Sequence, residues 1–490
     1  MANKIKQLAK DTVIYGGTTI FTRILNWLLV PLYTYKLENQ ADYGIVINLY
    51  AWTALLLVIL TYGMETGFFR FSNKQEGEAK VYSTSILSLG FTSLLFILII
   101  VLFIQPISVF LEYRNYKDIL IMLGIIVAMD AFTAIPFARL RYTNRPLRFA
   151  FVKIVLVGVN IFFNLFFFII LPAWHKSNPD GLISSLYNPD YGVKYVFVSN
   201  LFSSGIVLIM LLPEIIKAKF DFDFSLLKRM LKYSWPILIV GIAGIINQSG
   251  DKILYPFLID GTENARTQLG IYGANYKIAV IMVMFTQGFR YAFEPFIFKH
   301  KQESNSTREY ADVMKYFIIL GIFIFLGVMF YIDIVKYFIS SSYHSGLKVV
   351  PIVLTANLMF GIFFNLSLWY KLTDKTIFGA WLAILGSVIT LGINIIFVPK
   401  YGYIASAWAN FICYFSMVVI SYFLMQKYYP VKYELKKIFM HILIGGLLYV
   451  IDIKLIEPLG NIKYALSGVL LLGYLIYILR KEKLFKLFKH

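Results

Sequence analysis

The sequence has little cysteine and little charge, and both shortages restrict the class of protein. Its 490 residues include one cysteine, Cys413, so no disulfide bond can form within the chain. Charged residues make up only 15% of it, whereas soluble domains have about 25%. Hydrophobic residues make up 59%, and the mean hydropathy is +0.70. This composition predicts a polytopic membrane protein.

Motifs for catalysis and metal binding are also lacking. No pair of histidines has the spacing of metal ligands; the five are His175, His300, His344, His441 and His490. There is no GxSxG motif and no phosphate-binding GxxxxGK[ST] loop. We therefore predict a protein that is not an enzyme and needs no cofactor. A membrane glycan polymerase is the enzyme-class alternative, but the longest outer connection is only about 172–192.

Long apolar segments recur along the whole chain. A membrane span must be a helix or part of a closed barrel, and runs such as 161–171 do not alternate as barrel strands do. We predict an all-α polytopic fold of about fourteen transmembrane helices. The segments are 12–35, 43–70, 81–110, 118–140, 149–172, 193–216, 233–259, 269–298, 313–334, 347–370, 376–398, 402–426, 436–453 and 462–480.

The connecting segments carry an uneven share of the positive charge. Roughly 29 of the lysines and arginines lie on one side of the predicted membrane and roughly 11 on the other. The positive-inside rule then places both termini in the cytoplasm. Because this rule accounts for the basic loops, the net charge of +19 is not evidence for a nucleic-acid partner.

A short pattern repeats at nearly the same spacing in the two halves of the chain. Pro31 precedes the run 42–45 (DYGI), and Pro256 precedes 268–271 (QLGI). Parallel repeats in transporters are related by an axis along the membrane normal, with the substrate between them. We predict an N-terminal six-helix lobe at 1–222, a second lobe at 223–430 and two further helices at 431–490, with a cavity between the lobes.

Six basic residues fall inside or at the edge of apolar segments. A charge at the centre of a membrane helix costs about 2.5–3.5 kcal/mol, so six facing lipid would cost roughly 15–20 kcal/mol. We therefore expect a shared polar interior that suits an anionic substrate. The predicted substrate-binding residues are Arg23, Arg70, Lys153, Lys252, Lys277 and Arg290.

Some of these cations also have structural interpretations. Arg23 shares a helical face with polar and aromatic neighbours, which favours a substrate role. Arg70 can instead snorkel to the inner interface. Arg290 and Glu294 form an i,i+4 pair that would neutralise both charges.

Polar stripes mark two further helices. Asn160 and Asn164 continue the face of Lys153, where they can meet substrate or bond to neighbouring helices. Asp130 has no basic residue three or four positions away, and Asp251 adjoins Lys252. A membrane acid can carry a proton or bind Na⁺, so coupling to either ion through Asp130 and Asp251 is left open.

The order of several short motifs resembles that of bacterial polysaccharide flippases of the O-antigen type. This family shares a superfamily with lipid II flippases and with multidrug and toxin extrusion antiporters. The motifs are Gly16-Gly17 through Arg23, Pro31, Tyr43-Gly44, Glu65 to Arg70, Asn247, Asp251-Lys252, Gly270 to Ala274, Lys277, Phe293-Glu294-Pro295, Pro399 to Gly402 and Ala405 to Ala407.

The resemblance implies transport of an undecaprenyl-diphosphate-linked oligosaccharide across the bacterial inner membrane by alternating access. It implies a role in surface polysaccharide or lipopolysaccharide synthesis, with membrane lipid and assembly proteins as partners. Arg23 matches a functional arginine in the first helix of lipid II flippases. A cation-coupled drug antiporter and a lipid II flippase are the alternative transporters.

The charge distribution generates a prediction about topology. Single cysteines introduced into the 217–232 connection of a Cys413→Ala background should be labelled only after the membrane is permeabilised, because this basic connection is predicted to be cytoplasmic. A cysteine in the 172–192 connection is the matched outer control. Labelling of 217–232 from outside intact cells would reverse the orientation.

Overall fold

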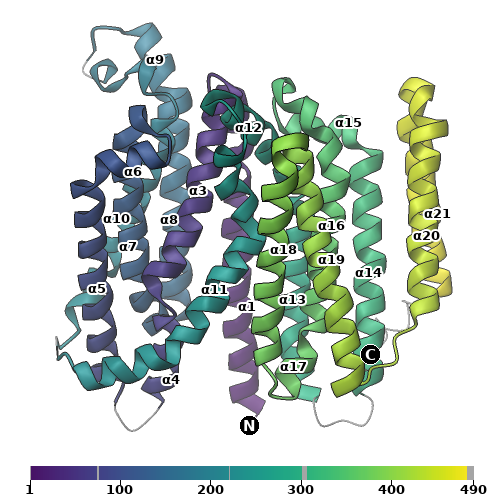
Figure 1. Ribbon diagram of the computed structural model, residues 1–490, viewed down its shortest axis with the longest axis horizontal. Coiled ribbons are helices and arrows are strands. Elements are labelled where there is room, and N and C mark those ends of the chain that lie inside the picture. Colours follow the sequence, from purple (N-terminus) through teal and green to yellow (C-terminus); the bar gives the residue numbers. More distant parts are fainter. Residues whose placement is uncertain (1, 74–76, 182, 220, 301–305, 483–490) are drawn as a thin grey trace. The chain divides into compact units, whose positions relative to one another are not determined.

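A computed structural model describes residues 2–73, 77–181, 183–219, 221–300 and 306–482. It describes only the backbone of residues 2–14, 186, 292–300, 306 and 461. Within this part of the chain every regular element is a helix, so the predicted all-α class is confirmed (Figure 1). The contacts divide the chain into two compact units, Met1–Gly273 and Ala274–His490, and the boundary falls within one helix.

The first unit contains twelve complete helices of the α or π type and most of a thirteenth α-helix among its described residues. They are α1 Ala2–Trp27, α2 Leu29–Lys36, α3 Gln40–Thr61, α4 Met64–Ser72, α5 Glu78–Leu102, α6 Ile104–Phe110, α7 Lys117–Tyr142, α8 Pro146–Leu165, the π-helix η2 Phe166–Ile170, α9 Leu171–Ser177, α10 Lys194–Ile216, α11 Phe224–Leu258 and α12 Thr262–Ile278. Short 3₁₀ turns lie at Arg114–Tyr116, Ser184–Leu186 and Pro189–Tyr191.

The second unit continues from the end of α12. Its elements are α13 Val280–His300, α14 Ser306–Phe330, α15 Ile332–Val335, η5 Lys336–Phe338, η6 Ser341–Val349, α16 Val350–Leu366, α17 Leu368–Leu372, α18 Ile377–Tyr401, α19 Tyr403–Tyr428, α20 Leu435–Ile451, η7 Asp452–Ile456, η8 Glu457–Ile462 and α21 Lys463–Lys481.

The helices agree with the predicted apolar segments one by one. Among the described residues, twelve helices are long and apolar enough to cross a membrane. The pair Thr262–Ile278 and Val280–Tyr291, bent by 45°, is a thirteenth if it forms one span. Helices α1 and α2 lie in the predicted segment 12–35, and counting this segment as a further span would give fourteen spans. The exact number of spans stays a prediction.

Several predicted segments are broken in the middle. Helix α1 ends at Trp27, four residues before Pro31, whose ring conflicts with the carbonyl group at that distance and which lacks an N–H. Tyr62 and Gly63 adopt positive φ angles of 35° and 69° between α3 and α4. These breaks change the direction of the chain without ending the apolar segment.

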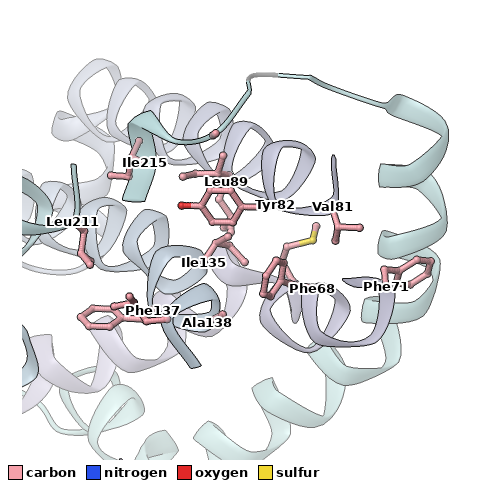
Figure 2. Packing of buried hydrophobic residues seen from close by; sticks show 14 of the residues in the cluster. Phe68, Phe71, Val81, Tyr82, Leu89, Ile135, Phe137, Ala138, Leu211 and Ile215 are labelled. Atoms are coloured by element: carbon pink, nitrogen blue, oxygen red, sulfur yellow. The ribbon is translucent and has the colours of Figure 1, made fainter. Parts of the chain in front are cut away.

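A buried cluster joins α4, α5, α7 and α10 at one end of the first unit. Figure 2 shows Phe68, Tyr82, Ile135 and Leu211 converging from these helices. The Tyr82 hydroxyl donates to the Glu214 carbonyl oxygen at 2.9 Å. In lipid, helix association depends on such packing and on hydrogen bonds, since the surrounding lipid is as apolar as the side chains.

The repeated glycines meet where α3 crosses α12. Gly44 and Gly270 are both buried, and each packs directly against backbone atoms of the other helix. A Cβ atom on Gly270 would collide with the carbonyl oxygen of Gln40, and one on Gly44 with that of Arg266. Small residues allow this close approach of two backbones.

The crossing predicts that Gly270→Ala lowers thermal stability. The added methyl group meets backbone that cannot rotate away, so we expect a cost of about 1–3 kcal/mol, typical of overpacking. Gly244→Ala on α11 is the control, because a Cβ atom there would meet nothing within 4 Å. Melting temperatures in detergent measure both. Equal values for the two variants would contradict the close crossing.

Candidate functional site

Arg23 lies near the end of α1 and is exposed. Within the described residues it forms no ion pair. Two of its predicted polar neighbours are engaged elsewhere. Thr19 donates to the Tyr15 carbonyl oxygen at 2.8 Å, and Asn26 accepts from Asn160 at 3.4 Å. Arg23 therefore presents a charge within the predicted apolar segment 12–35, and no described residue forms an ion pair with it.

Lys153 and Asp130 come together inside the first unit. Lys153 on α8 is half-buried, and its Nζ lies 4.0 Å from the centre of the Phe137 ring. Asp130 on α7 accepts a 2.8 Å hydrogen bond from the Ser204 hydroxyl of α10 and interacts electrostatically with Lys153. The acid that has no local basic partner in the sequence thus finds one on the neighbouring helix.

The asparagines of the Lys153 stripe bond to protein groups. The Asn164 amide donates to the Asn160 carbonyl oxygen at 2.8 Å and to its side-chain oxygen at 3.0 Å. Asn160 in turn reaches Asn26 of α1. The contact of Asn160 with α1 matches bonding between neighbouring helices, whereas these contacts of Asn164 stay within α8.

Asp251 and Lys252 form a buried ion pair in α11. The Lys252 Nζ lies 3.0 Å from Asp251 Oδ1, and the two residues are only 1% and 8% exposed. The Tyr272 hydroxyl of α12 donates to Asp251 Oδ2 at 2.8 Å. Asn48 of α3 donates to the Lys252 carbonyl oxygen at 2.7 Å and accepts from the Tyr113 hydroxyl at 3.0 Å. The pair is thus bonded directly to α12 and α3, and Tyr113 in turn fixes Asn48.

Arg70 and Glu65 have separate partners. The Arg70 guanidinium stacks 4.0 Å from the centre of the Tyr233 ring of α11, while Glu65 pairs with Arg141 of α7. Arg141 and the beginning of α11 both belong to predicted inner segments. Arg70 therefore lies near the inner end of its helix, as the snorkelling interpretation expects.

Two predicted cations belong to the elements around the start of the second unit. Lys277 is half-buried near the end of α12. Arg290 on α13 is exposed and stacks 4.1 Å from the centre of the Phe364 ring, which Lys371 also approaches at 4.9 Å. The side chain of Glu294 lies outside the described residues, so its predicted pairing with Arg290 stays a prediction.

The second unit contains a buried cation that the sequence analysis did not single out. Lys315, counted as a loop residue, is 4% exposed and its Nζ lies 2.6 Å from Glu434 and 3.3 Å from Glu482. Hydrogen bonds hold the pKa of Glu434 below its usual range. The bond from Lys315 has the largest effect, and the bond from Lys437 has the next largest. These contacts fasten α14 to the beginning of α20 and the residue after α21. Only Asp312, three residues before Lys315, was a local signal.

A second ionic cluster joins α15 to the last helix. Asp333 of α15 pairs with Lys336 and with Lys463 at the beginning of α21. Helix α21 is thus bonded near its end to Lys315 of α14 and at its beginning to α15, which follows α14.

The candidate site therefore consists of separate local groups. The structure brings Lys153 to Asp130 and Lys252 to Asp251 within the first unit. Among the described residues there is no cluster of three or more metal-ligating acids, histidines or cysteines. That all six cations face one cavity stays a prediction.

Comparison with known families agrees with the sequence motifs. A family model described as "Polysaccharide biosynthesis protein" matches residues 8–289, which is more than half of the chain. No curated protein matches the sequence.

Solved structures of transporters share the fold. A structure described as the lipid II flippase MurJ in an inward closed conformation has a TM-score of 0.73 at 15% identity, over 96% of this chain and 99% of that one. An inward-facing multidrug resistance MATE family transporter of the MOP superfamily has 0.63 at 13%, over 84% and 95%. A MOP superfamily transporter from Pyrococcus furiosus has 0.53 at 13%, over 86% and 94%. At these identities the likeness concerns the fold.

Proposed function

Because the chain belongs to the polysaccharide biosynthesis protein family, we propose that it is a flippase for lipid-linked oligosaccharide. The substrate is a glycan on undecaprenyl diphosphate, which moves from the cytoplasmic to the outer leaflet of the bacterial inner membrane by alternating access. The fold shared with transporters supports this function. Both chain termini lie in the cytoplasm in this proposal, as the positive-inside rule expects.

Arg23 is the observation that carries the proposal. An exposed arginine inside a membrane span costs free energy unless it has a polar partner, and the described residues supply no carboxylate for Arg23. A diphosphate is a suitable partner because its oxygens accept two parallel hydrogen bonds from one guanidinium. Two other exposed cations of the predicted set, Arg70 and Arg290, stack on aromatic rings.

The buried acids bear on energy coupling. Asp130 is held by Ser204 and lies near Lys153, so a change of its protonation alters the local charge balance among α7, α8 and α10. Asp251 has Lys252 as a direct counter-ion. We propose Asp130 as the residue that couples transport to a proton or Na⁺ gradient, with Asp251 as the second candidate.

The role of Arg23 predicts a loss of transport in Arg23→Ala. Purified protein in liposomes that contain an undecaprenyl-diphosphate-linked glycan should lose nearly all leaflet transfer, because the bidentate anion contact is removed. Arg23→Lys should retain part of the transport rate, since lysine keeps the positive charge but cannot form the bidentate contact of a guanidinium group. Separate liposomes with lipid II and with a cationic drug test the alternative substrates.

Arg308→Ala is the matched control, because Arg308 is an exposed arginine at the start of α14 in a predicted inner loop. It should transport at the rate of the unaltered chain. A folded Arg23→Ala protein with the normal rate would remove Arg23 from the substrate path. Transfer of the drug but not of the glycan would favour an antiporter.

The coupling proposal predicts that Asp130→Asn abolishes stimulation of transport by an imposed gradient. Asparagine keeps a group that can accept the Ser204 hydrogen bond but cannot exchange a proton. Flipping in liposomes with and without a proton or Na⁺ gradient measures the effect. Asp190→Asn, at an exposed outer position, should leave the stimulation intact. Unchanged stimulation in both Asp130→Asn and Asp251→Asn would exclude the two acids.

A further inference from the structure

A polar pocket lies where the turn between α6 and α7 meets the beginning of α12. It has a volume of about 490 Å³, within the range of about 300–1,000 Å³ that is usual for ligand sites. Its lining includes Glu112, Arg114, Asn115, Tyr116, Glu263 and Arg266. All of these residues belong to the first unit, and the predicted topology places them at the outer surface.

The walls of the pocket are bonded to each other. Arg266, 8% exposed, donates to the Glu112 carbonyl oxygen at 2.6 Å. Its guanidinium carbon lies 4.7 Å from the centre of the Tyr113 ring and 5.4 Å from that of Tyr116. The Thr262 hydroxyl donates to Glu112 Oε2 at 2.7 Å. Glu112, Thr262 and Arg266 are therefore held in place before any ligand arrives, which lowers the entropic cost of binding.

Glu112 adopts a backbone conformation that is unfavourable for glutamate. Its φ is 63°, in the left-handed region, just after α6 ends. Glycine is the usual residue at such a helix end because any side chain there costs free energy. A carboxylate nevertheless occupies the position, at the edge of a pocket. Strain of this kind is concentrated at functional sites.

The charges of the pocket indicate the chemistry of its ligand. Two carboxylates, of Glu112 and Glu263, balance two guanidinium groups, of Arg114 and Arg266. A net positive pocket would favour phosphate and a net negative one a cation, but here neither sign dominates. Carboxylates only accept hydrogen bonds, guanidinium groups only donate them, and the Asn115 amide does both. Such a set matches adjacent hydroxyl groups, each of which donates and accepts.

We infer that this pocket binds one neutral sugar unit, a hexose or an N-acetylhexosamine, of the glycan at the outer surface. The inference rests on the proposed function, which brings a glycan to this side of the membrane. It assigns the diphosphate and the sugar to different places. The cations in the spans meet the anionic carrier, while the outer pocket meets the uncharged glycan.

The test is binding of free sugars to the purified full-length chain in detergent, followed by saturation-transfer NMR. The probes are glucose, galactose, mannose, N-acetylglucosamine and N-acetylgalactosamine, with inorganic phosphate as a competitor. At least one sugar should bind, and phosphate should not displace it. Glu112→Gly suits the backbone and removes the carboxylate, so it should fold and weaken binding about tenfold or more.

Glu263→Gln is the second variant, because it keeps the shape of an exposed side chain and should weaken binding similarly. Lys176→Met, which removes an exposed charge from the outer loop away from the pocket, should bind as the unaltered chain does. The assignment is overturned if no sugar binds, if phosphate displaces it, or if both pocket variants bind normally.

The liposome assay separates the two proposals. If the chain moves lipid-linked glycan but binds no free sugar, the flippase proposal stands and the sugar pocket is wrong. If sugar binds in the manner described and no lipid-linked glycan is moved, the pocket stands and the flippase proposal fails.

Discussion

The neutralisation of charge inside hydrocarbon is the constraint on which the rest of this structure depends. An ion in a membrane span needs a counter-ion, a polar cavity or a path to the headgroups. Asp251 and Lys252 form a direct ion pair, whereas Asp130 and Lys153, on neighbouring helices, interact electrostatically. Arg23 is different because no described residue neutralises it. The same physical rule that accounts for these four residues is the reason why we propose that Arg23 contacts an anionic substrate.

The fold was largely predictable because the length of each apolar segment can be read directly from the sequence. Each predicted segment contains a helix, since the backbone has no other way to pair its polar groups in lipid. The breaks were less visible. Hydropathy shows how long an apolar segment is, but it does not show whether the helix within that segment is straight. The interruption at Tyr62 and Gly63 and the bend between α12 and α13 could therefore not be predicted from it. Pro31, four residues after the end of α1, was a weak sequence signal for the break between α1 and α2.

The candidate site was predictable in its residue types but not in its pairings. Neighbours three or four positions away share a helix face, and a search limited to them leaves Asp130 alone. Its partners, Lys153 and Ser204, come from α8 and α10 and are brought to it only by tertiary packing. Arg266 was missed for the same reason, because an arginine after an outer turn normally lies in water. Here two tyrosines and a carbonyl group bury it.

The two glycines of the internal repeat connect these observations. Residues that are equivalent in two-fold-related repeats can touch only near the axis, so the predicted repeat would place the contact of Gly44 with Gly270 there. Arg266 lies one helical turn before Gly270, and its carbonyl oxygen faces Gly44. If alternating access moves α3 and the α6–α7 turn together away from α12 at this end, the bond from Arg266 to Glu112 in that turn breaks. The two walls of the outer pocket then part, so a sugar bound between them favours the state in which this end is closed.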